Sequence, residues 1–270
     1  IARLVAEGVR VDLVTCTDGA EGEIHDPTLD ADEARPRLAQ IRAAELACSV
    51  DALGSGAIHH HVLGYRDSGM IGTDANAHPD SFWQADLDEA TQRLTEIVRA
   101  SQPSAIVSYD ENGNYGHPDH INAARIARQA YQASRGEAWQ VARFYEVAFV
   151  RERWSELMTT MKERGIALPW DFDDETQRLG ETADQPEEGD GVEFGRSDAE
   201  VTTRVDVSGH LDAKRRSMDC HKTQRQDLGW LLDLPDDLAD QAIDTEYYVL
   251  RWLDGSDVDS TRRETWLLGA

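Results

Sequence analysis

"SAIVSYDENGNYGHPDHINAAR", residues 104–125, joins three kinds of sequence in one stretch. It opens with a near-continuous apolar run, which is typical of a strand buried in a parallel sheet. A loop rich in glycine and polar residues follows, and Pro118 suits the first turn of a helix predicted over residues 121–133. Because ligands bind outside the carboxyl ends of the strands in open α/β sheets, this loop is a candidate site.

The same alternation of strands and helices extends to both sides of this stretch. Residues 1–9 are expected to form the second half of a helix that stops at Gly8, and helices are also predicted over residues 36–54 and 87–100. Strands are predicted for RVDLVTCT, IHHHVLGY and RFYEVAFV. We therefore expect an α/β fold with a Rossmann-like, mostly parallel sheet flanked by helices.

The alternation loosens after residue 150. We predict a single domain over residues 1–270, with an α/β core over residues 1–150 and a C-terminal extension over residues 151–270. The elements expected in the extension are a helix over residues 152–164, an acidic surface loop over residues 173–195, a strand in AEVTTRVDVS, and final helices that include residues 211–224 with Ser208 as cap.

The charge of the chain is strongly acidic. Lys and Arg number 27 and Asp and Glu number 52, so the formal net charge is −25. This balance argues against nucleic acids and anionic membranes as partners, because a phosphate binder needs a basic patch. No apolar run is long enough to span a membrane and no signal segment is recognisable, so we expect a cytoplasmic protein. The sequence leaves self-association into a homo-oligomer open.

Three cysteines, Cys16, Cys48 and Cys220, form no CxxC pair. Their number and spacing favour unpaired thiols in a reducing compartment. Cys48 falls in a helical pattern and is expected in the core. Cys220 is the one closest to a candidate functional residue, since His221 follows it.

Histidines supply the candidate metal ligands. His117 and His120 are three residues apart at a helix start, where both can point to one side. His59, His60 and His61 are consecutive on a predicted strand, so they face alternate sides and cannot converge on one ion. A second His-Pro-Asp, in NAHPDSFW (residues 76–83), lacks another close ligand, and we expect His78 at most to line a pocket. Spacing alone therefore leaves the metal undecided.

Five motifs together resemble the LmbE-like / PIG-L family of zinc-dependent de-N-acetylases, whose members include the mycothiol-pathway deacetylase and the mycothiol S-conjugate amidase. The motifs are VTCTDGAEGE (14–23), RAAEL (42–46), GYRDSGM (64–70), SYDENGNYGHPDH (108–120) and HKTQ (221–224). The resemblance implies hydrolysis of the amide of an N-acyl amino-sugar conjugate, with a small-molecule amino-sugar as substrate. It implies Zn²⁺ as the cofactor, with Fe²⁺ as the alternative metal, and leaves the choice between N-acetylglucosamine deacetylase and S-conjugate amidase open.

Carried over residue by residue, the resemblance assigns roles to nine residues. His120 is a zinc ligand, His117 is the imidazole that stabilises or protonates the tetrahedral intermediate, Asp119 stands behind His117, and Tyr115 is a loop phenol near the scissile amide. The residues expected to bind substrate are Arg42 and Asp67 on sugar hydroxyls, with Glu23, Met70 and His221 in the pocket wall.

The family's other signature, an AHPDDE-type motif that supplies two zinc ligands and the general base, does not occur in these 270 residues. Residues 77–80 only imitate it, because Ser81 and Phe82 stand where Asp-Glu should follow. We expect the motif upstream of Ile1, in a strand and loop before the helix that opens the sequence. These 270 residues by themselves are then expected to bind zinc poorly and to lack the base.

Two other classes of protein compete with the enzyme. One is a catalytically inactive family member that acts as a sugar-binding or scaffold protein, which the missing motif would favour. The other is a nucleotide-binding Rossmann protein, which is disfavoured because no GxGxxG follows a strand.

Overall fold

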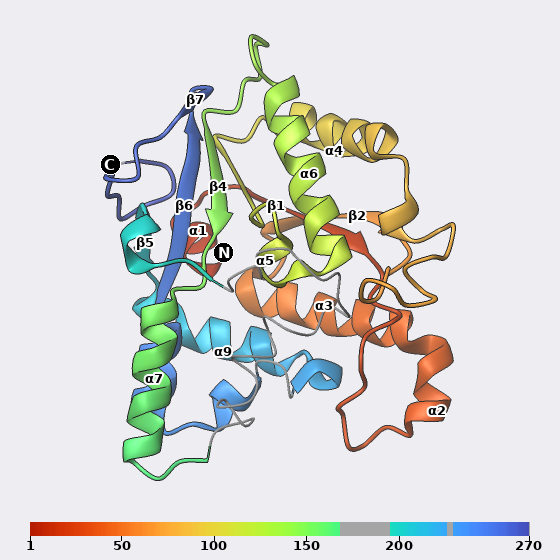
Figure 1. The fold of residues 1–270 in the computed structure, drawn as a ribbon, viewed down its shortest axis with the longest axis vertical. Coiled ribbons are helices and arrows are strands. Elements are labelled where there is room, and N and C mark those ends of the chain that lie inside the picture. The colour runs from red at the N-terminus through yellow and green to blue at the C-terminus, as the bar shows by residue number, and fades with distance from the viewer. Residues whose placement is uncertain (168–194, 226–228, 270) are drawn as a thin grey trace, which may run out of the picture. The chain divides into compact units, whose positions relative to one another are not determined.

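A computed structural model describes residues 1–167, 195–225 and 229–269 (Figure 1). The chain divides into two compact units. Unit 1 comprises residues 1–86 and 206–245, and unit 2 comprises residues 87–205 and 246–270. The sequence-based division at residue 150 differs from this grouping, and the organisation as a single domain stays a prediction.

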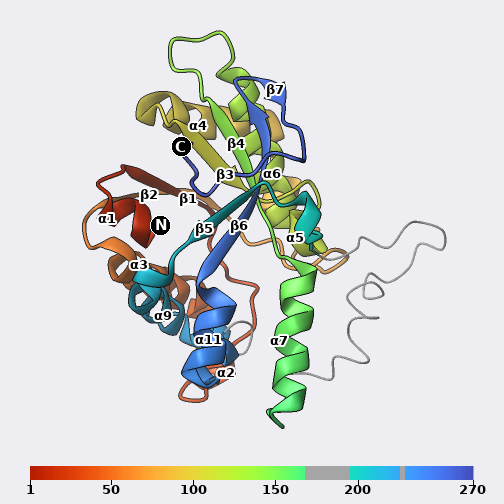
Figure 2. The ribbon, with the colours of Figure 1, turned by 90° about the vertical axis from the view of Figure 1, so that its left-hand side faces the viewer.

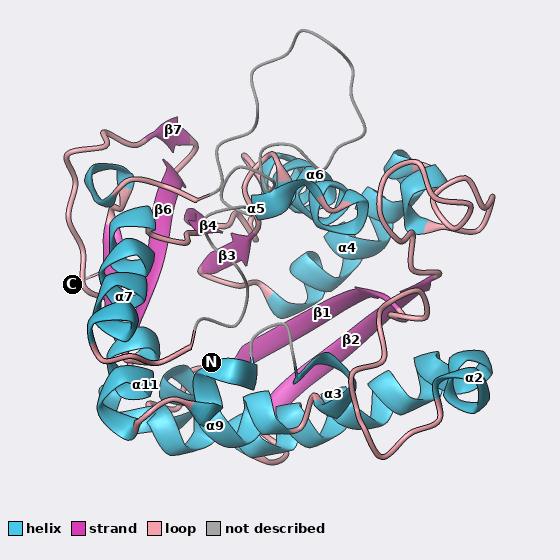
Figure 3. Cartoon of the chain, turned by 60° about the horizontal axis from the view of Figure 1, so that its bottom comes forward, coloured by secondary structure: helices cyan, strands magenta, loops and turns pink. Residues whose placement is uncertain are grey.

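Unit 1 is built on two parallel strands, β1 (Val11–Thr17) and β2 (Ile58–Tyr65), which pair with Val11 opposite Ile58. The chain crosses from β1 to β2 through α2 (Ala31–Ala34) and α3 (Leu38–Gly54). Asp30 starts α2, since its carboxylate accepts hydrogen bonds from the main-chain N–H groups of the first turn. Figure 3 shows α3 running along one side of the strand pair.

A distant segment of the chain completes unit 1. Helix α9 (Leu211–Asp219) packs along α3, and α11 (Asp236–Ile243) follows it (Figure 3). At the other end of the sequence, α1 (Ala2–Ala6) is followed by Gly8 in a left-handed conformation, as the helix stop predicted there requires. Unit 1 therefore combines the start of the sequence with residues more than 200 positions later.

Unit 2 contains a sheet with the strand order β3-β4-β6-β5, and β7 pairs with β6 (Figure 2). The strands are β3 (Ala105–Ser108), β4 (Arg143–Val147), β5 (Thr203–Asp206), β6 (Thr245–Leu253) and β7 (Ser256–Asp257). β3 and β4 are parallel, whereas β4 and β6 are antiparallel. The helices are α4 (Leu87–Ser101), the short α5 (Gly113–Gly116), α6 (Pro118–Ala133) and α7 (Arg151–Glu163). α4 and α6 pack against each other (Figure 1).

Aromatic side chains fix α6 to the sheet of unit 2. Tyr131 of α6 stacks on Trp252 of β6 with ring centroids 5.2 Å apart, and Phe144 of β4 lies 5.0 Å from the same indole. Tyr131 and Phe144 are fully buried. Such offset and edge contacts add to the burial of large apolar surface. The far end of α6 is thus held rigidly, which steadies the helix start that carries the candidate site.

The predicted α/β fold is confirmed, including the predicted strands at β1 to β4 and the helices at α1, α3, α4, α6 and α7. Strand β6, TEYYVLRWL, was not predicted, although its aromatic and β-branched residues are typical of a strand. The acidic loop predicted over residues 173–195 lies, except for Gly195, outside the described residues. No helix in the described parts of the chain is long and apolar enough to cross a bilayer.

Two predictions about the helix over residues 211–224 are wrong. Ser208 is not its cap: Ser208 lies in a 3₁₀ turn and its N–H donates to Asp206 Oδ1, while His210 occupies the N-cap position. The helix also ends early, at Asp219, and a 3₁₀ turn over Lys222–Gln224 follows. Contacts with α3 redirect the chain there, and local sequence does not reveal them.

The prediction of three unpaired thiols is also wrong. Cys48 on α3 and Cys220 after α9 form a disulfide, with Cα atoms 5.7 Å apart and a sequence separation of 172. Cys48 is exposed rather than part of the core. The two cysteines approach each other only because α3 and α9 pack together, so sequence spacing alone could not pair them.

Candidate active site

The loop between β3 and α6 is shaped by the carboxylate of Asp110. Asp110 Oδ1 accepts hydrogen bonds from the main-chain N–H groups of Asn112 at 3.0 Å and Asn114 at 2.8 Å. Asn114 has a positive φ of 66°, a conformation that asparagine tolerates better than most residues. Asp110 and Asn114 are both buried. The loop is therefore a defined turn that starts directly after the strand.

Glycine is required at position 113 by the approach of His120. Gly113 has a φ of +62°, and a Cβ there would lie 2.7 Å from Cβ of His120. Without a side chain, the Gly113 carbonyl comes within 3.3 Å of His120 Nδ1. A carbonyl can only accept, so Nδ1 is the protonated nitrogen and Nε2 carries the lone pair that a metal would take.

Four rings gather at the start of α6. Tyr109 stacks on His120 with ring centroids 4.1 Å apart and nearly parallel planes. Tyr115 meets His120 edge-on at 5.1 Å, and the His117 and His120 rings are 5.0 Å apart. Tyr115 is 48% exposed, whereas the imidazoles are half-buried. The structure therefore brings His117 and His120 together, as their spacing predicted, and it places the Tyr115 ring against both.

His117 is the N-cap of α6, and Pro118 occupies the first turn as predicted. His117 Nδ1 accepts a hydrogen bond of 3.2 Å from the main-chain N–H of Asp119. In the neutral ring the proton must then be on Nε2, which makes that nitrogen the donor. Asp119 is buried and contacts His117 through its main chain, and a role for its carboxylate stays a prediction.

Behind the loop lies an ionic network that the sequence did not reveal. Arg196 pairs with Asp110 at 3.3 Å and with the fully buried Glu146 of β4 at 3.6 Å. Glu146 also pairs with Arg128 and Arg251. Burial raises the pKa of Glu146, and the three arginines oppose that shift. The network links the sheet to the carboxylate that shapes the loop, but its five residues come from five separate parts of the chain.

In unit 1, Asp67 holds two loops together. Its Oδ1 accepts from the N–H of Gly69 at 2.9 Å and its Oδ2 accepts from the N–H of Glu21 at 3.2 Å. Its own N–H donates to Asp18 Oδ1 at 3.0 Å, and Arg66 pairs with Glu21. Asp67 is buried. The loops after β1 and β2 are thus fixed to each other at one edge of the strand pair, as their positions after parallel strands predicted.

Arg42 lies against the loop after β1. Its Nη2 donates to the Glu23 carbonyl at 3.1 Å. A Cβ at Gly22 would fall 2.2 Å from Arg42 Nη1, and one at Gly19 would fall 2.8 Å from Arg42 Cδ. Gly19 also has a φ of +68°, which strains any other residue, whereas at Gly22 only the flexible end of the arginine would have to move. The Arg42 side chain thus passes close to the DGAEGE loop from the first half of α3.

The other three predicted binding residues also lie in unit 1. Glu23 is mostly exposed and pairs with His25 at 2.8 Å, and Met70 is 43% exposed. His221 is half-buried. Burial lowers the pKa of His221, the charge of Glu45 opposes this shift, and Arg42 adds to it. His221 is therefore close to both of these residues of α3.

The histidines that were excluded from the site behave as predicted. On β2, His59 and His60 are exposed and His61 is half-buried, paired with Asp12 at 2.9 Å. In the second His-Pro-Asp, His78 Nδ1 accepts from the N–H of Asp80 at 3.1 Å, so it closes a local turn.

The predicted site residues thus form two groups. Unit 1 holds Glu23, Arg42, Asp67, Met70 and His221, and unit 2 holds Tyr115, His117, Asp119 and His120. Within the described residues of either unit taken alone, no three His, Cys, Asp or Glu side chains lie close enough to hold a metal ion together. The prediction that His120 binds a metal therefore requires ligands that the described residues of unit 2 do not supply.

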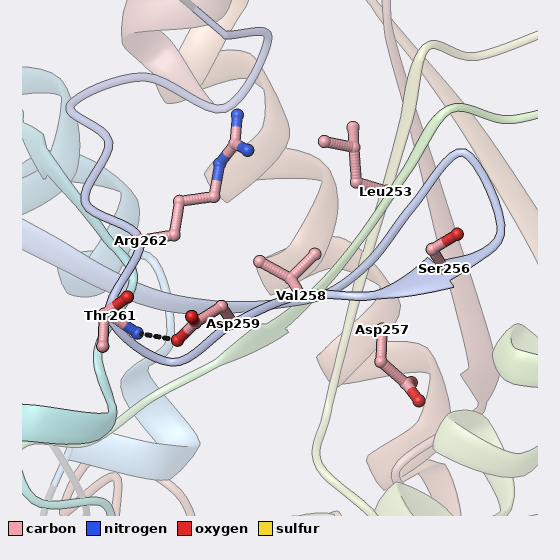
Figure 4. Close-up of a pocket in the computed structure, with 7 residues that line it drawn as sticks. All are labelled: Leu253, Ser256, Asp257, Val258, Asp259, Thr261 and Arg262. Carbon is pink, nitrogen blue, oxygen red and sulfur yellow. Dashed lines mark hydrogen bonds between the residues drawn. The ribbon is translucent and has the colours of Figure 1, made fainter.

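A pocket beside the β6–β7 hairpin of unit 2 does not mark this site (Figure 4). It is lined by seven residues between Leu253 and Arg262, none of them a predicted site residue. Two of the lining residues are joined by a local hydrogen bond, in which the Thr261 N–H donates to Asp259 Oδ1 at 2.8 Å.

Comparison with known proteins assigns the family. Residues 1–131 match the PIG-L profile, described as GlcNAc-PI de-N-acetylase. The 1D-myo-inositol 2-acetamido-2-deoxy-alpha-D-glucopyranoside deacetylase of Thermobispora bispora is 41% identical over 236 residues, covering 83% of this chain and 72% of the relative. The Acidothermus cellulolyticus protein of the same name is 40% identical over 257 residues, covering 93% and 82%.

Among solved structures, the N,N'-diacetylchitobiose deacetylase from Pyrococcus horikoshii matches with a TM-score of 0.39 and 21% identity, covering 67% of this chain and 69% of the other. The family resemblance first suggested by five short motifs is confirmed by the relatives, which match far beyond those motifs. This chain belongs to the PIG-L family of de-N-acetylases.

Proposed function

We propose that the protein hydrolyses the acetamide of an N-acetylglucosamine joined to inositol, releasing acetate and the free amine. The observation that carries this proposal is the 41% identity to the Thermobispora bispora deacetylase over 72% of that enzyme's length. The arrangement at the start of α6, with two imidazoles and a phenol in contact, is suited to acid–base chemistry on an amide.

We propose zinc as the metal, with Fe²⁺ as the alternative. The geometry of His120 supports a metal at this position. Its Nδ1 donates to the Gly113 carbonyl, which leaves Nε2 as the ligand atom. Stacking on Tyr109 fixes the plane of the ring. Imidazole oriented by a carbonyl at its other nitrogen is the usual arrangement of a metal-binding histidine. Zinc supplies polarisation of the amide carbonyl and activation of water when it is bound.

The chain's own residues then divide the remaining work. His117, with the Asp119 N–H on Nδ1, holds a proton on Nε2 that it donates to the oxygen or nitrogen of the amide. Tyr115 is half exposed beside it and offers a phenol O–H. Arg42 and Asp67 are proposed to bind sugar hydroxyls, and Glu23, Met70 and His221 to line the pocket.

The test is an acetate-release assay on the complete gene product. The substrates are the N-acetylglucosaminyl-inositol named for the relatives, free N-acetylglucosamine, and a mycothiol S-conjugate. We expect acetate from the first substrate at the highest kcat/KM. Release of a mercapturate from the S-conjugate alone would replace the deacetylase by an amidase. No turnover of any substrate, with binding of the sugar by calorimetry, would favour the inactive binding protein.

The cytoplasmic location and the homo-oligomer expected from the sequence stay predictions. The Cys48–Cys220 disulfide bears on the first, since structural disulfides are rare in reducing compartments. Mass spectrometry of the thiol-blocked protein from cell extract shows whether this bond exists where the protein works.

A further inference from the structure

Glu45 is a buried carboxylate that no part of the proposed reaction uses. It lies on α3, one turn after Arg42, and only 8% of its surface is exposed. Removing a carboxylate from water costs several kcal/mol unless hydrogen bonds replace the lost solvation. An apolar residue would fill the same place at lower cost, so the contacts of this carboxylate need an explanation.

Both oxygens of Glu45 are used by one residue of a distant turn. Oε1 accepts from the main-chain N–H of Thr223 at 2.7 Å, and Oε2 accepts from the Thr223 hydroxyl at 2.7 Å. Thr223 is fully buried. Two hydrogen bonds to one residue fix both the position and the rotation of the turn formed by residues 221–224.

The same face of α3 anchors the segment that precedes this turn. Ser49 Oγ lies 2.6 Å from Ser217 Oγ, and Cys48 forms the disulfide with Cys220. These residues follow Glu45 by three and four positions, which places all of them on one side of the helix. The anchoring thus ends at Thr223, two residues after His221.

The turn formed by residues 221–224 is also hydrogen-bonded to the loop after β1. The Thr223 carbonyl accepts from the N–H of His25 at 2.9 Å, and His25 Nε2 pairs with Glu23 at 2.8 Å. A continuous path of contacts therefore runs from Glu45 through Thr223 and His25 to Glu23. His221 and Glu23, both proposed to line the pocket, are placed by this path.

We infer that Glu45 is a positioning residue for sugar recognition, fixing the 221–224 turn and through it the loop that carries Glu23. The inference rests on the proposed deacetylase function. A residue that places the pocket wall affects how well the substrate is held, and it leaves the groups at the start of α6 unchanged. The effect is therefore expected in KM rather than in kcat.

The experiment compares Glu45→Ala, Glu45→Gln and Thr223→Val in the complete, metal-loaded gene product. Loss of two hydrogen bonds to a carboxylate should raise KM for the inositol substrate on the order of 10-fold or more in Glu45→Ala, with kcat within about twofold. Glu45→Gln should restore most of the affinity, because its amide can accept from the N–H and donate to the Thr223 hydroxyl. Thr223→Val should give an intermediate KM.

Asp51→Asn is the matched control, since Asp51 is an exposed carboxylate on the same helix. It should leave KM unchanged. A second readout, hydrogen exchange of the peptides covering residues 18–26 and 221–225, should quicken in Glu45→Ala and remain slow in Asp51→Asn. If Glu45→Ala does not fold, Thr223→Val carries the test, because it removes the hydroxyl bond and leaves the amide bond in place.

Unchanged KM in a folded Glu45→Ala, or a fall in kcat alone, would overturn the inference while wild-type activity leaves the proposed function standing. No acetate release by the wild-type protein would remove both the proposed function and the inference, whatever the exchange rates. Failure of Glu45→Gln to restore KM would also contradict the positioning role.

Discussion

The candidate residues of unit 2 and those of unit 1 are positioned by contacts of very different sequence separation. In unit 2, the hydrogen bonds between side chains and main-chain groups that shape the loop carrying His117 and His120 join residues at most seven positions apart. In unit 1, the contacts that place His221 join segments 178 residues apart, from Glu45 to Thr223. The first group depends on local sequence and the second on tertiary packing. Changes in unit 2 should therefore affect chemistry, and changes in unit 1 should affect stability and binding.

The largest effect is expected from His120→Ala, which removes the imidazole that Gly113 and Tyr109 orient. Deacetylase activity should fall to background and the zinc content should drop, because a ligand is lost. Activity and elemental analysis measure this, with His59→Ala as control on an exposed strand histidine. Full zinc content in His120→Ala would show that this histidine is not a zinc ligand. The proposal that the unit 2 residues help to bind the metal would then be wrong.

His117→Ala should lower kcat by about 10²–10⁴-fold, the range for loss of a general acid or base, with zinc content unchanged. The thermal midpoint should fall by only a few degrees, since the ring is half-buried and loss of its capping bond on α6 costs about 1 kcal/mol. Kinetics and metal analysis of the same preparation separate the two histidines. Equal loss of metal in both variants would contradict the division of roles between them.

For unit 1, Cys48→Ser with Cys220→Ser should lower the free energy of unfolding by about 2–5 kcal/mol, since the bond closes a long loop of the unfolded chain. Urea unfolding without reductant measures it, and Cys16→Ser is the control outside the disulfide. If the double variant keeps its stability but loses kcat, unit 1 has a chemical role and the contrast between the two units is wrong.

The smallest effect is a pH dependence of stability from His221. Burial lowers its pKa below the ordinary 6.5, so the folded protein keeps the ring neutral where the unfolded chain already binds a proton. Stability should therefore decline as the pH falls from about 7 towards 5, and less steeply in His221→Asn. Urea unfolding across this pH range is the measurement, and parallel curves for the two proteins would refute the buried setting of the ring.

Sequence reasoning succeeded where contacts are local. Pro118, the i, i+3 histidines and the preceding apolar strand predicted the unit 2 loop, and the structure brings those rings together. It failed where two distant segments meet. The disulfide, the end of α9 at Asp219 and the role of Glu45 all follow from the packing of α9 on α3, which no spacing within either segment encodes. Strand β6 was missed because it lies in the C-terminal extension, where the alternation of strands and helices used for the prediction has already loosened.

The arginine network around Glu146 is a second feature that the sequence alone does not reveal. Each of Arg128, Arg196 and Arg251 looks like an ordinary surface cation in its own segment. Only the fold places them around one buried carboxylate and links Arg196 to Asp110, the residue that shapes the loop.

The bond between Cys48 and Cys220 has a practical consequence for handling the protein. A protease that cuts any single peptide bond between these two positions produces two fragments that remain covalently joined. Such nicked material migrates as one band on a non-reducing gel and as two after reduction. A preparation that looks intact without reductant can therefore already be cleaved.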